Sequence, residues 1–178
     1  MKAYVRDIEP QDFQLVTDYF LNASDTHLLK MGVDKRKLPN HSRWLQLLEE
    51  DYRKPFSEKE AHYLMWEQDG VAVGHSSINK LTYGKEGYIH LHVWNPDARK
   101  SGLGSYFISE SITRYFEQFA LKQVRCEPNA QNDAPNRTLK RIGFEFIKCY
   151  RTTPGWINFE QEVNSWVLDK EKWAAKSG

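Results

Sequence analysis

The sequence predicts an α/β fold with a mixed, mostly antiparallel central sheet of about six to seven strands, flanked by about four helices. Seven short segments are typical of strands, and four longer ones show apolar residues at helical spacing. The chain has 178 residues, of which 40% are hydrophobic, which is enough for one buried core and short for two. We therefore expect a single domain over residues 1–178.

The N-terminal half begins with a predicted strand over Ala3 to Ile8 and a helix that follows Pro10, a favourable residue in a first helical turn. Residues 24–40 are polar and are predicted to be irregular. A second amphipathic helix is expected over Ser42 to Tyr52. Three consecutive strands then indicate an antiparallel meander, because only turn signals separate them: Ala61 to Trp66, Val71 to Asn79 and Gly87 to Trp94.

In the C-terminal half, helices and strands alternate. A helix over Gly102 to Phe119 precedes a strand, so a parallel crossover is expected. The short helix that follows is expected to end at Gly143, since glycine commonly follows a helix end. The remaining predicted elements are a strand at Gln123 to Cys126, the short helix at Asn136 to Ile142, and strands at Phe144 to Tyr150 and Val163 to Leu168.

Charge and cysteine content argue against several classes of protein. The 25 basic and 24 acidic residues leave a formal net charge of +1, so no overall field favours nucleic acid or a membrane surface. The N-terminus lacks the apolar core of a leader, and no apolar run could span a bilayer, which favours a cytoplasmic protein. Cys126 and Cys149 lack metal-ligand spacing and are expected to be buried reduced thiols, with no metal bound.

The most informative stretch runs from Val93 to Gly104, where a strand-like segment meets the pattern Arg99-x-x-Gly102-x-Gly104 at a helix start. Glycines let a ligand approach the backbone, and the free amides of a first helical turn suit a pyrophosphate. The stretch is neither a dinucleotide fingerprint, because Phe107 stands where a third glycine is needed, nor an ATP-binding loop. A glycine-rich helix start without a ligand is the alternative interpretation.

Three local patterns together resemble the GNAT superfamily of acyl-CoA N-acyltransferases, over nearly the whole chain. They are Pro96-x-x-Arg99-x-x-Gly102-x-Gly104, the stretch Asn132-Asp-Ala-Pro-Asn136-Arg-Thr-Leu139, and Ile142-Gly143-Phe144. The second of these and the ending Trp166-Val-Leu-Asp169 look most like the branch that includes ribosomal-protein N-terminal acetyltransferases. The resemblance implies acetyl-CoA as the acyl donor and leaves the acceptor open.

The resemblance also implies how the donor is held. The pyrophosphate would lie on the loop amides and the helix start, and the pantetheine arm would pair like an added strand beside Val93 and Trp94. The Trp94 amide would donate to the thioester carbonyl, and Asn132 would contact the pantetheine arm unless it only caps its helix. The expected donor-binding residues are Val93, Trp94, Arg99, Lys100, Ser101, Gly102, Leu103, Gly104, Ser105 and Asn132.

An attacking amine arrives largely as ammonium and must lose a proton, so a base is expected. With a period of two residues, Glu86, Tyr88, His90 and His92 share one polar face of their strand, and the opposite face is apolar. His90 and Glu86 rank first as the base, followed by His92, with Glu127 as a fourth candidate. Each of them is also interpretable as an ordinary hydrogen-bonded strand residue.

One departure from the family concerns the acid that protonates the leaving thiolate. Many members carry a tyrosine in the short helix, where this chain has Thr138, Leu139 and Lys140, and Pro135 replaces a serine found in many relatives. Tyr150 lies too far along the chain to align with that tyrosine. Water is sufficient, because a CoA thiol is acidic enough to leave as thiolate.

The sequence thus predicts an N-acetyltransferase that transfers an acetyl group directly from acetyl-CoA to a primary amine in a ternary complex. The acceptor is a protein N-terminus or a small-molecule amine, and the protein is a monomer or homodimer. A catalytically silent acyl-CoA or CoA-binding module is the alternative, and thioester hydrolysis a third outcome. The acceptor wall is expected from residues 24–55 and 152–159, both idiosyncratic.

Overall fold

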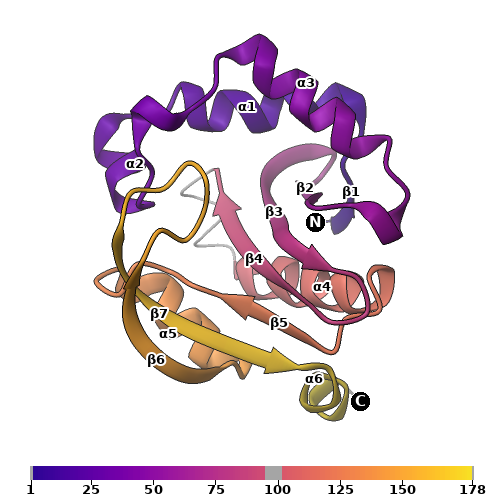
Figure 1. The fold of residues 1–178 in the computed structure, drawn as a ribbon. Coiled ribbons are helices and arrows are strands. Elements are labelled where there is room, and N and C mark those ends of the chain that lie inside the picture. The colour runs from indigo at the N-terminus through magenta and orange to yellow at the C-terminus, as the bar shows by residue number, and fades with distance from the viewer. Residues whose placement is uncertain (1, 95–101, 178) are drawn as a thin grey trace.

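The computed structural model describes residues 2–94 and 102–177 as one seven-stranded sheet covered by helices on both faces (Figure 1). The strand order is β1-β2-β3-β4-β5-β7-β6, and every neighbouring pair is antiparallel except the parallel pair β4 and β5. This confirms the predicted fold class. The strands are β1 (Ala3–Asp7), β2 (His62–Gln68), β3 (Val71–Thr82), β4 (Glu86–Val93), β5 (Gln123–Cys126), β6 (Glu145–Thr152) and β7 (Gln161–Asp169).

The helices differ from the prediction in three places. Residues 24–40 are not irregular: they contain α2, whose cap Ser24 accepts a hydrogen bond from the His27 N–H, and a 3-10 turn at Lys35–Lys37. Helix α5 begins three residues earlier than expected, and α6 was not predicted at all. The six α-helices of the described chain are α1 (Phe13–Leu21), α2 (Asp25–Lys30), α3 (His41–Tyr52), α4 (Leu103–Gln118), α5 (Asp133–Ile142) and α6 (Lys170–Ser177).

Two hydrophobic clusters lie on opposite faces of the sheet. The larger one packs α4 and α5 against one face, through fully buried residues such as Ile112 and Leu139. The smaller one packs α1, α2 and α3 against the other face, where Val16 and Met65 are fully buried. The apolar side of β4 belongs to the larger cluster, so its polar side faces the layer of α1 and α2 (Figure 1).

Backbone and side-chain hydrogen bonds tie the segment after α2 to the connection between β6 and β7. The Gly32 carbonyl accepts from Phe159 N at 3.2 Å, Asn158 Nδ2 at 2.9 Å and Gln161 Nε2 at 3.0 Å. Asp34 N also donates to Ile157 O at 2.8 Å. Gly32 has a φ of +70°, which strains any other residue, and a Cβ at this position would also displace the end of the Gln161 side chain, so glycine is favoured here.

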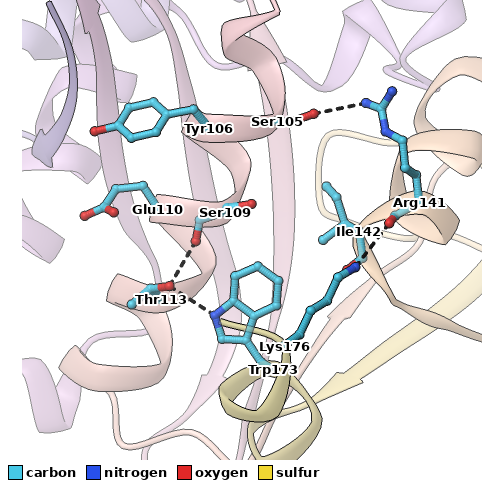
Figure 2. A pocket seen from close by; sticks show the side chains of 9 residues that line it. All are labelled: Ser105, Tyr106, Ser109, Glu110, Thr113, Arg141, Ile142, Trp173 and Lys176. Carbon is cyan, nitrogen blue, oxygen red and sulfur yellow. Dashed lines mark hydrogen bonds between the residues drawn. The ribbon is translucent and has the colours of Figure 1, made fainter. Parts of the chain in front are cut away.

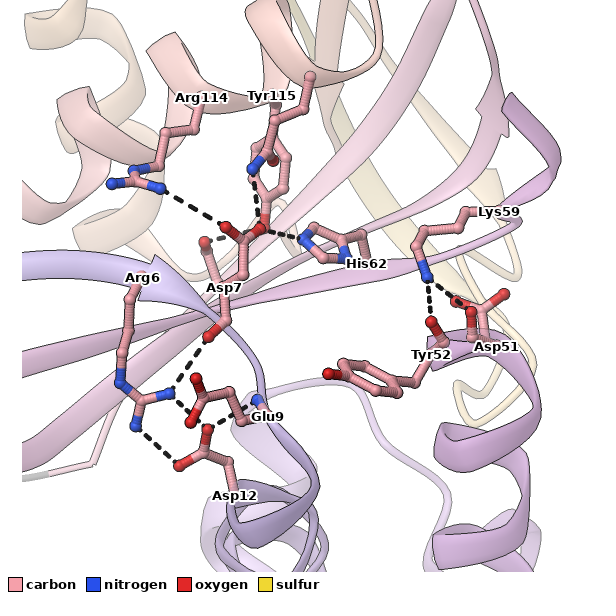
Figure 3. A network of polar contacts seen from close by, with 12 residues as sticks. Arg6, Asp7, Glu9, Asp12, Asp51, Tyr52, Lys59, His62, Arg114 and Tyr115 are labelled. Atoms are coloured by element: carbon pink, nitrogen blue, oxygen red, sulfur yellow. Dashed lines mark hydrogen bonds and ion pairs between the residues drawn. The ribbon is translucent and has the colours of Figure 1, made fainter. Parts of the chain in front are cut away.

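A polar network at the β1 edge fixes the start of the fold (Figure 3). The Arg6 guanidinium contacts the Asp12 carboxylate through two nitrogens at 2.6 and 2.9 Å, and its Nε lies 2.6 Å from Glu67 Oε1. The Asp12 and Glu67 side chains are only 4% and 9% exposed. Arg6 therefore neutralises two carboxylates that are shielded from water.

Arg6→Met is expected to lower the free energy of unfolding by about 3 kcal/mol, because it leaves buried Asp12 and Glu67 without a cation. Arg151→Met is the control, since the Arg151 and Glu160 side chains are 66% and 64% exposed and such pairs contribute less than about 1 kcal/mol. Urea unfolding of both variants measures the difference. Equal losses of unfolding free energy in the two variants would contradict the role of Arg6 as the cation that neutralises Asp12 and Glu67.

The cysteines are not alike. Cys126 is buried, and burial raises the pKa of its thiol to about 12, so it is not a nucleophile. The prediction is wrong for Cys149, which is exposed on the edge strand β6, where most side chains reach solvent. Among the described residues, no helix combines the length and apolarity that a membrane span requires.

Candidate active site

The parallel pair β4 and β5 separates partway along its length. Its last paired residues are Tyr88 and Arg125, whereas β4 continues through Ile89 to Val93 without a partner on β5. Residues 89–92 of β4 therefore have no strand pairing on the β5 side. This matches the expected position for an extended ligand that pairs like an added strand.

The ladder between β3 and β4 determines which backbone groups of β4 face that opening. Trp94 N donates to Val73 O at 2.9 Å, so the even-numbered amides near the end of β4 pair with β3. The expectation that the Trp94 amide polarises the thioester is therefore wrong. By the alternation of an antiparallel ladder, the amides of Leu91 and Val93 point toward β5 instead.

The first turn of α4 lies where the glycine motif ends. Gly102 is its N-cap with a φ of +75°, and Leu103, Gly104 and Ser105 are its first three residues. A Cβ at Gly104 would meet no atom within 4 Å, so nothing in the described protein requires glycine there. Arg99, Lys100 and Ser101, the other residues expected to hold the pyrophosphate, lie outside the described residues.

Asn132 occupies the N-cap position of α5, yet its side chain makes no capping hydrogen bond. The interpretation of Asn132 as a simple cap is therefore wrong. The anchor is Asn136: its Oδ1 accepts from Asn164 Nδ2 at 2.9 Å and Trp166 Nε1 at 2.8 Å, and its Nδ2 donates to the carbonyls of Asn129 and Asn132. These bonds fix the start of α5 and leave the Asn132 side chain available for a ligand.

Glu86 lies at the closed end of the β4–β5 pair, opposite Gln123. Its carboxylate forms an ion pair with Arg125 Nε at 2.8 Å and also accepts from Gln123 Nε2. The Arg125 hydrogen bond lowers the pKa of Glu86. The structure therefore places Glu86 away from the opening and already paired, which disfavours it as the base.

Three histidines occupy the polar side of β3 and β4. His75 lies opposite His92 on the neighbouring strand, and their rings stack with centroids 4.7 Å apart. The half-buried His90 places Nε2 3.1 Å from Asn79 Oδ1. Burial lowers the pKa of His90 to about 4 and that of His92 well below its usual range, so both rings are neutral near pH 7.

His75 is fully buried, and its Nδ1 accepts a hydrogen bond from Trp94 Nε1 at 2.8 Å. Its Nε2 has no partner among the described residues. Burial lowers the pKa of His75 to about 3. The ring therefore stays neutral and holds the Trp94 indole at the end of β4.

Stability is expected to fall below pH 6.5 because of His75. The folded-state pKa of about 3 lies below the unfolded value of about 6.5, so the unfolded chain takes up the proton first as the pH falls. At pH 5 the loss is about 2 kcal/mol, at about 1.4 kcal/mol per pH unit. Urea unfolding at pH 7.5 and pH 5 measures it: His75→Gln should reduce the total pH dependence by about 2 kcal/mol and leave the part that His90 and His92 contribute, whereas His41→Gln, at an exposed site, should not reduce it.

Glu127 follows the last residue of β5, at the level where β4 and β5 have separated. Because Tyr88 is opposite Arg125, His90 and Glu127 lie two residues further along their parallel strands and face the same side. Glu127 Oε1 accepts from Tyr150 Oη at 2.5 Å. Burial and this hydrogen bond raise the pKa of Tyr150 to about 12, so the phenol stays protonated. Tyr150 lies too far along the sequence to align with the family's acid tyrosine, yet the fold brings it beside Glu127, the fourth candidate base.

The split parallel pair beside a glycine-started helix is the arrangement that the resemblance implied for acyl-CoA N-acyltransferases. The model of the acetyltransferase (GNAT) family matches residues 29–144, so the chain belongs to this family and is an acyltransferase by class. No curated protein sequence matches the chain.

Solved structures share the fold. A spermidine N-acetyltransferase from Vibrio cholerae, in complex with CoA and spermine, has a TM-score of 0.79 at 12% identity, covering 97% of this chain and 98% of that one. RimL, a ribosomal L7/L12 α-N-protein acetyltransferase in complex with CoA, has a TM-score of 0.76 at 14% identity, covering 97% and 96%. At this identity the likeness concerns the fold.

Proposed function

We propose that the protein transfers an acetyl group from acetyl-CoA directly to a primary amine within a ternary complex. One observation supports this most strongly: β4 separates from β5 with the first turn of α4 on one side and Glu127 at the mouth of the opening. The arrangement offers a helix N-terminus for an anion, a stretch of β4 at residues 89–92 with no β5 partner, and a carboxylate in one region. A donor bound there presents its thioester beside the carboxylate.

The donor would be held by backbone groups more than by side chains. The α4 amides at Leu103, Gly104 and Ser105, at the positive end of a 16-residue helix, suit the pyrophosphate. Arg99, Lys100 and Ser101 complete this site in our proposal. The pantetheine arm would run along the opening, with Val93 on one side and Asn132 on the other, and the bound CoA moiety supplies the acyl thioester.

The chemistry is an attack of the amine nitrogen on the thioester carbonyl carbon. A C–N bond forms, the C–S bond breaks, and the acetyl group leaves CoA as an amide. Negative charge develops on the carbonyl oxygen, where an amide of β4 that faces the opening would stabilise it. The ammonium loses one proton to a base before the attack, and the nitrogen loses a second proton from the tetrahedral intermediate. One proton is taken up by the thiolate, through water or a nearby acid, and the other is released to solvent, so protons balance.

We assign the base to Glu127 in place of the higher-ranked candidates. Glu86 is neutralised by Arg125, and burial lowers the pKa values of His90 and His92, which makes both rings weak bases. Glu127 has one described partner, the Tyr150 hydroxyl, which leaves its other oxygen for an ammonium or a relaying water. Its charge also attracts the protonated acceptor. Tyr150, still protonated, would return a proton to the thiolate in this proposal.

The acceptor in this proposal is a protein N-terminus or a small-molecule amine that approaches over the polar side of β4. The segment after α2 and the β6–β7 connection would form its wall, since hydrogen bonds at Gly32 join them above this face. Trp156, which is 56% exposed and contacts the Trp44 ring, offers an apolar surface there.

A direct test measures release of CoA thiol from acetyl-CoA in the presence of a panel of peptides and small amines. Thiol release that depends on an amine, together with acetylated product of the expected mass, supports the proposal. Binding of acetyl-CoA without any thiol release over the whole panel would favour a silent CoA-binding module. Thiol release without acetylated product would indicate thioester hydrolysis.

A further inference from the structure

Two lysines lie over tyrosine rings on either side of Glu127. Lys80 Nζ lies 4.8 Å from the centroid of the Tyr88 ring, and Lys148 Nζ lies 4.5 Å from the centroid of the Tyr150 ring. Both distances are within the range of about 6 Å for cation–π contact, which localises an ammonium group without neutralising its charge. Two localised positive charges therefore flank the carboxylate that we assign as the base.

The sheet register places Lys148 level with Glu127. The pairing of β5 with β7 brings Glu127 opposite Ser165, and the partner of Ser165 on β6 is Lys148. Residues at the same level of neighbouring strands face the same side of a sheet, and the backbones of Glu127 and Lys148 are two strand spacings, or about 10 Å, apart. A molecule of one or two amino-acid residues can span the space between the two side chains, because an extended residue covers about 3.4 Å.

Lys80 reaches the same side of the sheet through an unusual backbone conformation. Its φ is +48°, and it lies where the register between β3 and β4 shifts, between Asn79 and Thr82. Few residues other than glycine adopt this conformation, and it is found more often at functional positions. Burial and, in addition, the Lys80 charge lower the pKa of His90, so the ammonium group lies near this ring on the polar side of β4.

Carboxylates of the described chain do not neutralise these two lysines. Both side chains are exposed, and neither forms an ion pair with a described residue. Glu86, on the same side of the sheet, is paired with Arg125. Asp169 is opposite Gln123, four residues or about 13 Å along the strands from the level of Glu127. This side of the sheet therefore offers one carboxylate for an ammonium group and two cations for an anion.

Two other cations with neutral hydrogen-bond acceptors belong to a different part of the protein. Figure 2 shows Arg141 and Lys176 beside α4, where Arg141 Nη2 donates to Ser105 Oγ at 3.1 Å and Lys176 Nζ donates to Ile142 O at 2.6 Å. Helices α4 and α5 pack against the opposite face of the sheet. These two cations are therefore separate from the side on which the acceptor approaches.

We infer that Lys80 and Lys148 bind an anionic group of the acceptor, and that the protein therefore prefers amines that carry a carboxylate a few bonds away. The inference rests on the proposed function, because Glu127 must receive the ammonium end. Acidic amino acids and peptides with an acidic first residue share this combination of charges. A polyamine carries positive charge throughout, so the two lysines repel it and favour the carboxylate-bearing amine.

The test measures amine binding by calorimetry in the presence of saturating CoA, which has no acetyl group and therefore permits binding without reaction. A tripeptide amide that begins with aspartate is compared with one that begins with asparagine, and free aspartate and spermidine complete the set. The wild type should bind the aspartyl peptide at least about tenfold more tightly than the asparaginyl peptide, since hydrogen bonds to charged groups distinguish the two. Spermidine should bind more weakly than the aspartyl peptide.

Variants of the two lysines assign the preference to them. Lys80→Gln and Lys148→Gln should each weaken binding of the aspartyl peptide and leave the asparaginyl peptide nearly unchanged, and in the double variant the ratio of the two should approach one. Lys140→Gln is the matched control, because it removes the same charge from an exposed position of α5 on the opposite face of the sheet. Unchanged melting temperature and CoA affinity identify the variants that keep the fold and the donor site.

The outcomes separate this inference from the proposed function. Equal or undetectable binding of the two peptides by the wild type, a preference that survives in the double variant, or tighter binding of spermidine would overturn the inference. Thiol release from acetyl-CoA with any other amine would then still support acetyl transfer. Selective binding of the aspartyl peptide without thiol release would overturn the proposed transfer and keep the anion site. Whichever of free aspartate and the aspartyl peptide binds more tightly identifies the source of the carboxylate.

Discussion

Gly104→Asp is expected to lower the affinity for acetyl-CoA by at least about 100-fold without destabilising the protein. The new carboxylate would lie in the first turn of α4 and repel the pyrophosphate from the helix amides. Stability should be unchanged or slightly higher, because an acidic residue near a helix N-terminus is favourable by about 0.3–1 kcal/mol and glycine is a poor helix former. A Cβ at this position meets no atom within 4 Å.

Thermal melting measures both effects in one experiment. At 100 times its dissociation constant, acetyl-CoA should stabilise the wild type by about 2.7 kcal/mol, or about 5–10 °C for a domain of this size. Gly104→Asp should melt at the wild-type temperature alone and lose this increase. Gly104→Asn, whose side chain has the shape of aspartate without its charge, should keep more of the increase in melting temperature. A full increase in the aspartate variant would mean that the pyrophosphate binds elsewhere.

Glu127→Gln is expected to reduce kcat/KM for the amine acceptor by about 100- to 1000-fold, the range typical of a lost acid–base group. Glutamine keeps the size and can still accept from the Tyr150 hydroxyl. It cannot take up a proton or attract an ammonium ion. Binding of acetyl-CoA should be unchanged, because Glu127 is assigned to the acceptor side of the opening.

Glu86→Gln is the matched control, since it makes the same chemical change on a carboxylate paired with Arg125. Its kcat/KM should stay within about threefold of the wild type. The pH profile adds a second readout: no inflection is expected near pH 6.5, because burial holds the pKa of His90 at about 4 and that of His92 well below its usual range. A large loss in Glu86→Gln with a mild one in Glu127→Gln would reverse the assignment.

Local patterning predicted most of the fold because the two faces of the sheet differ in polarity. The alternation along β4 placed Gly87 and Ile89 inside, and the structure buries both. The short helix α2 was missed, since six residues contain too few apolar positions for a clear helical period and its signal is the single cap Ser24. Helix α6, with its single buried apolar anchor Trp173, gave a similarly weak signal.

The candidate site was less predictable because it depends on strand order. Tyr150 reaches Glu127 although β7 lies between β5 and β6 in the sheet, an order that consecutive strands in the sequence do not suggest. The pairing of Glu86 with Arg125 depends on the β4–β5 register in the same way. Backbone direction also mattered: the sequence predicted β4 as the strand beside the donor, which stays a prediction, and only the ladder shows that Trp94 N is already bonded to Val73 O.

The hydrogen bonds at Gly32 constrain how this protein can change its acceptor over evolution or by engineering. Two segments more than 120 residues apart share one carbonyl, and a side chain at Gly32 would strain the backbone and displace the Gln161 amide that donates to that carbonyl. A graft that imports only the α2 segment, or only the β6–β7 connection, from another family member would sever these bonds. Acceptor preference should therefore transfer between relatives when both segments move together, as a single inherited module.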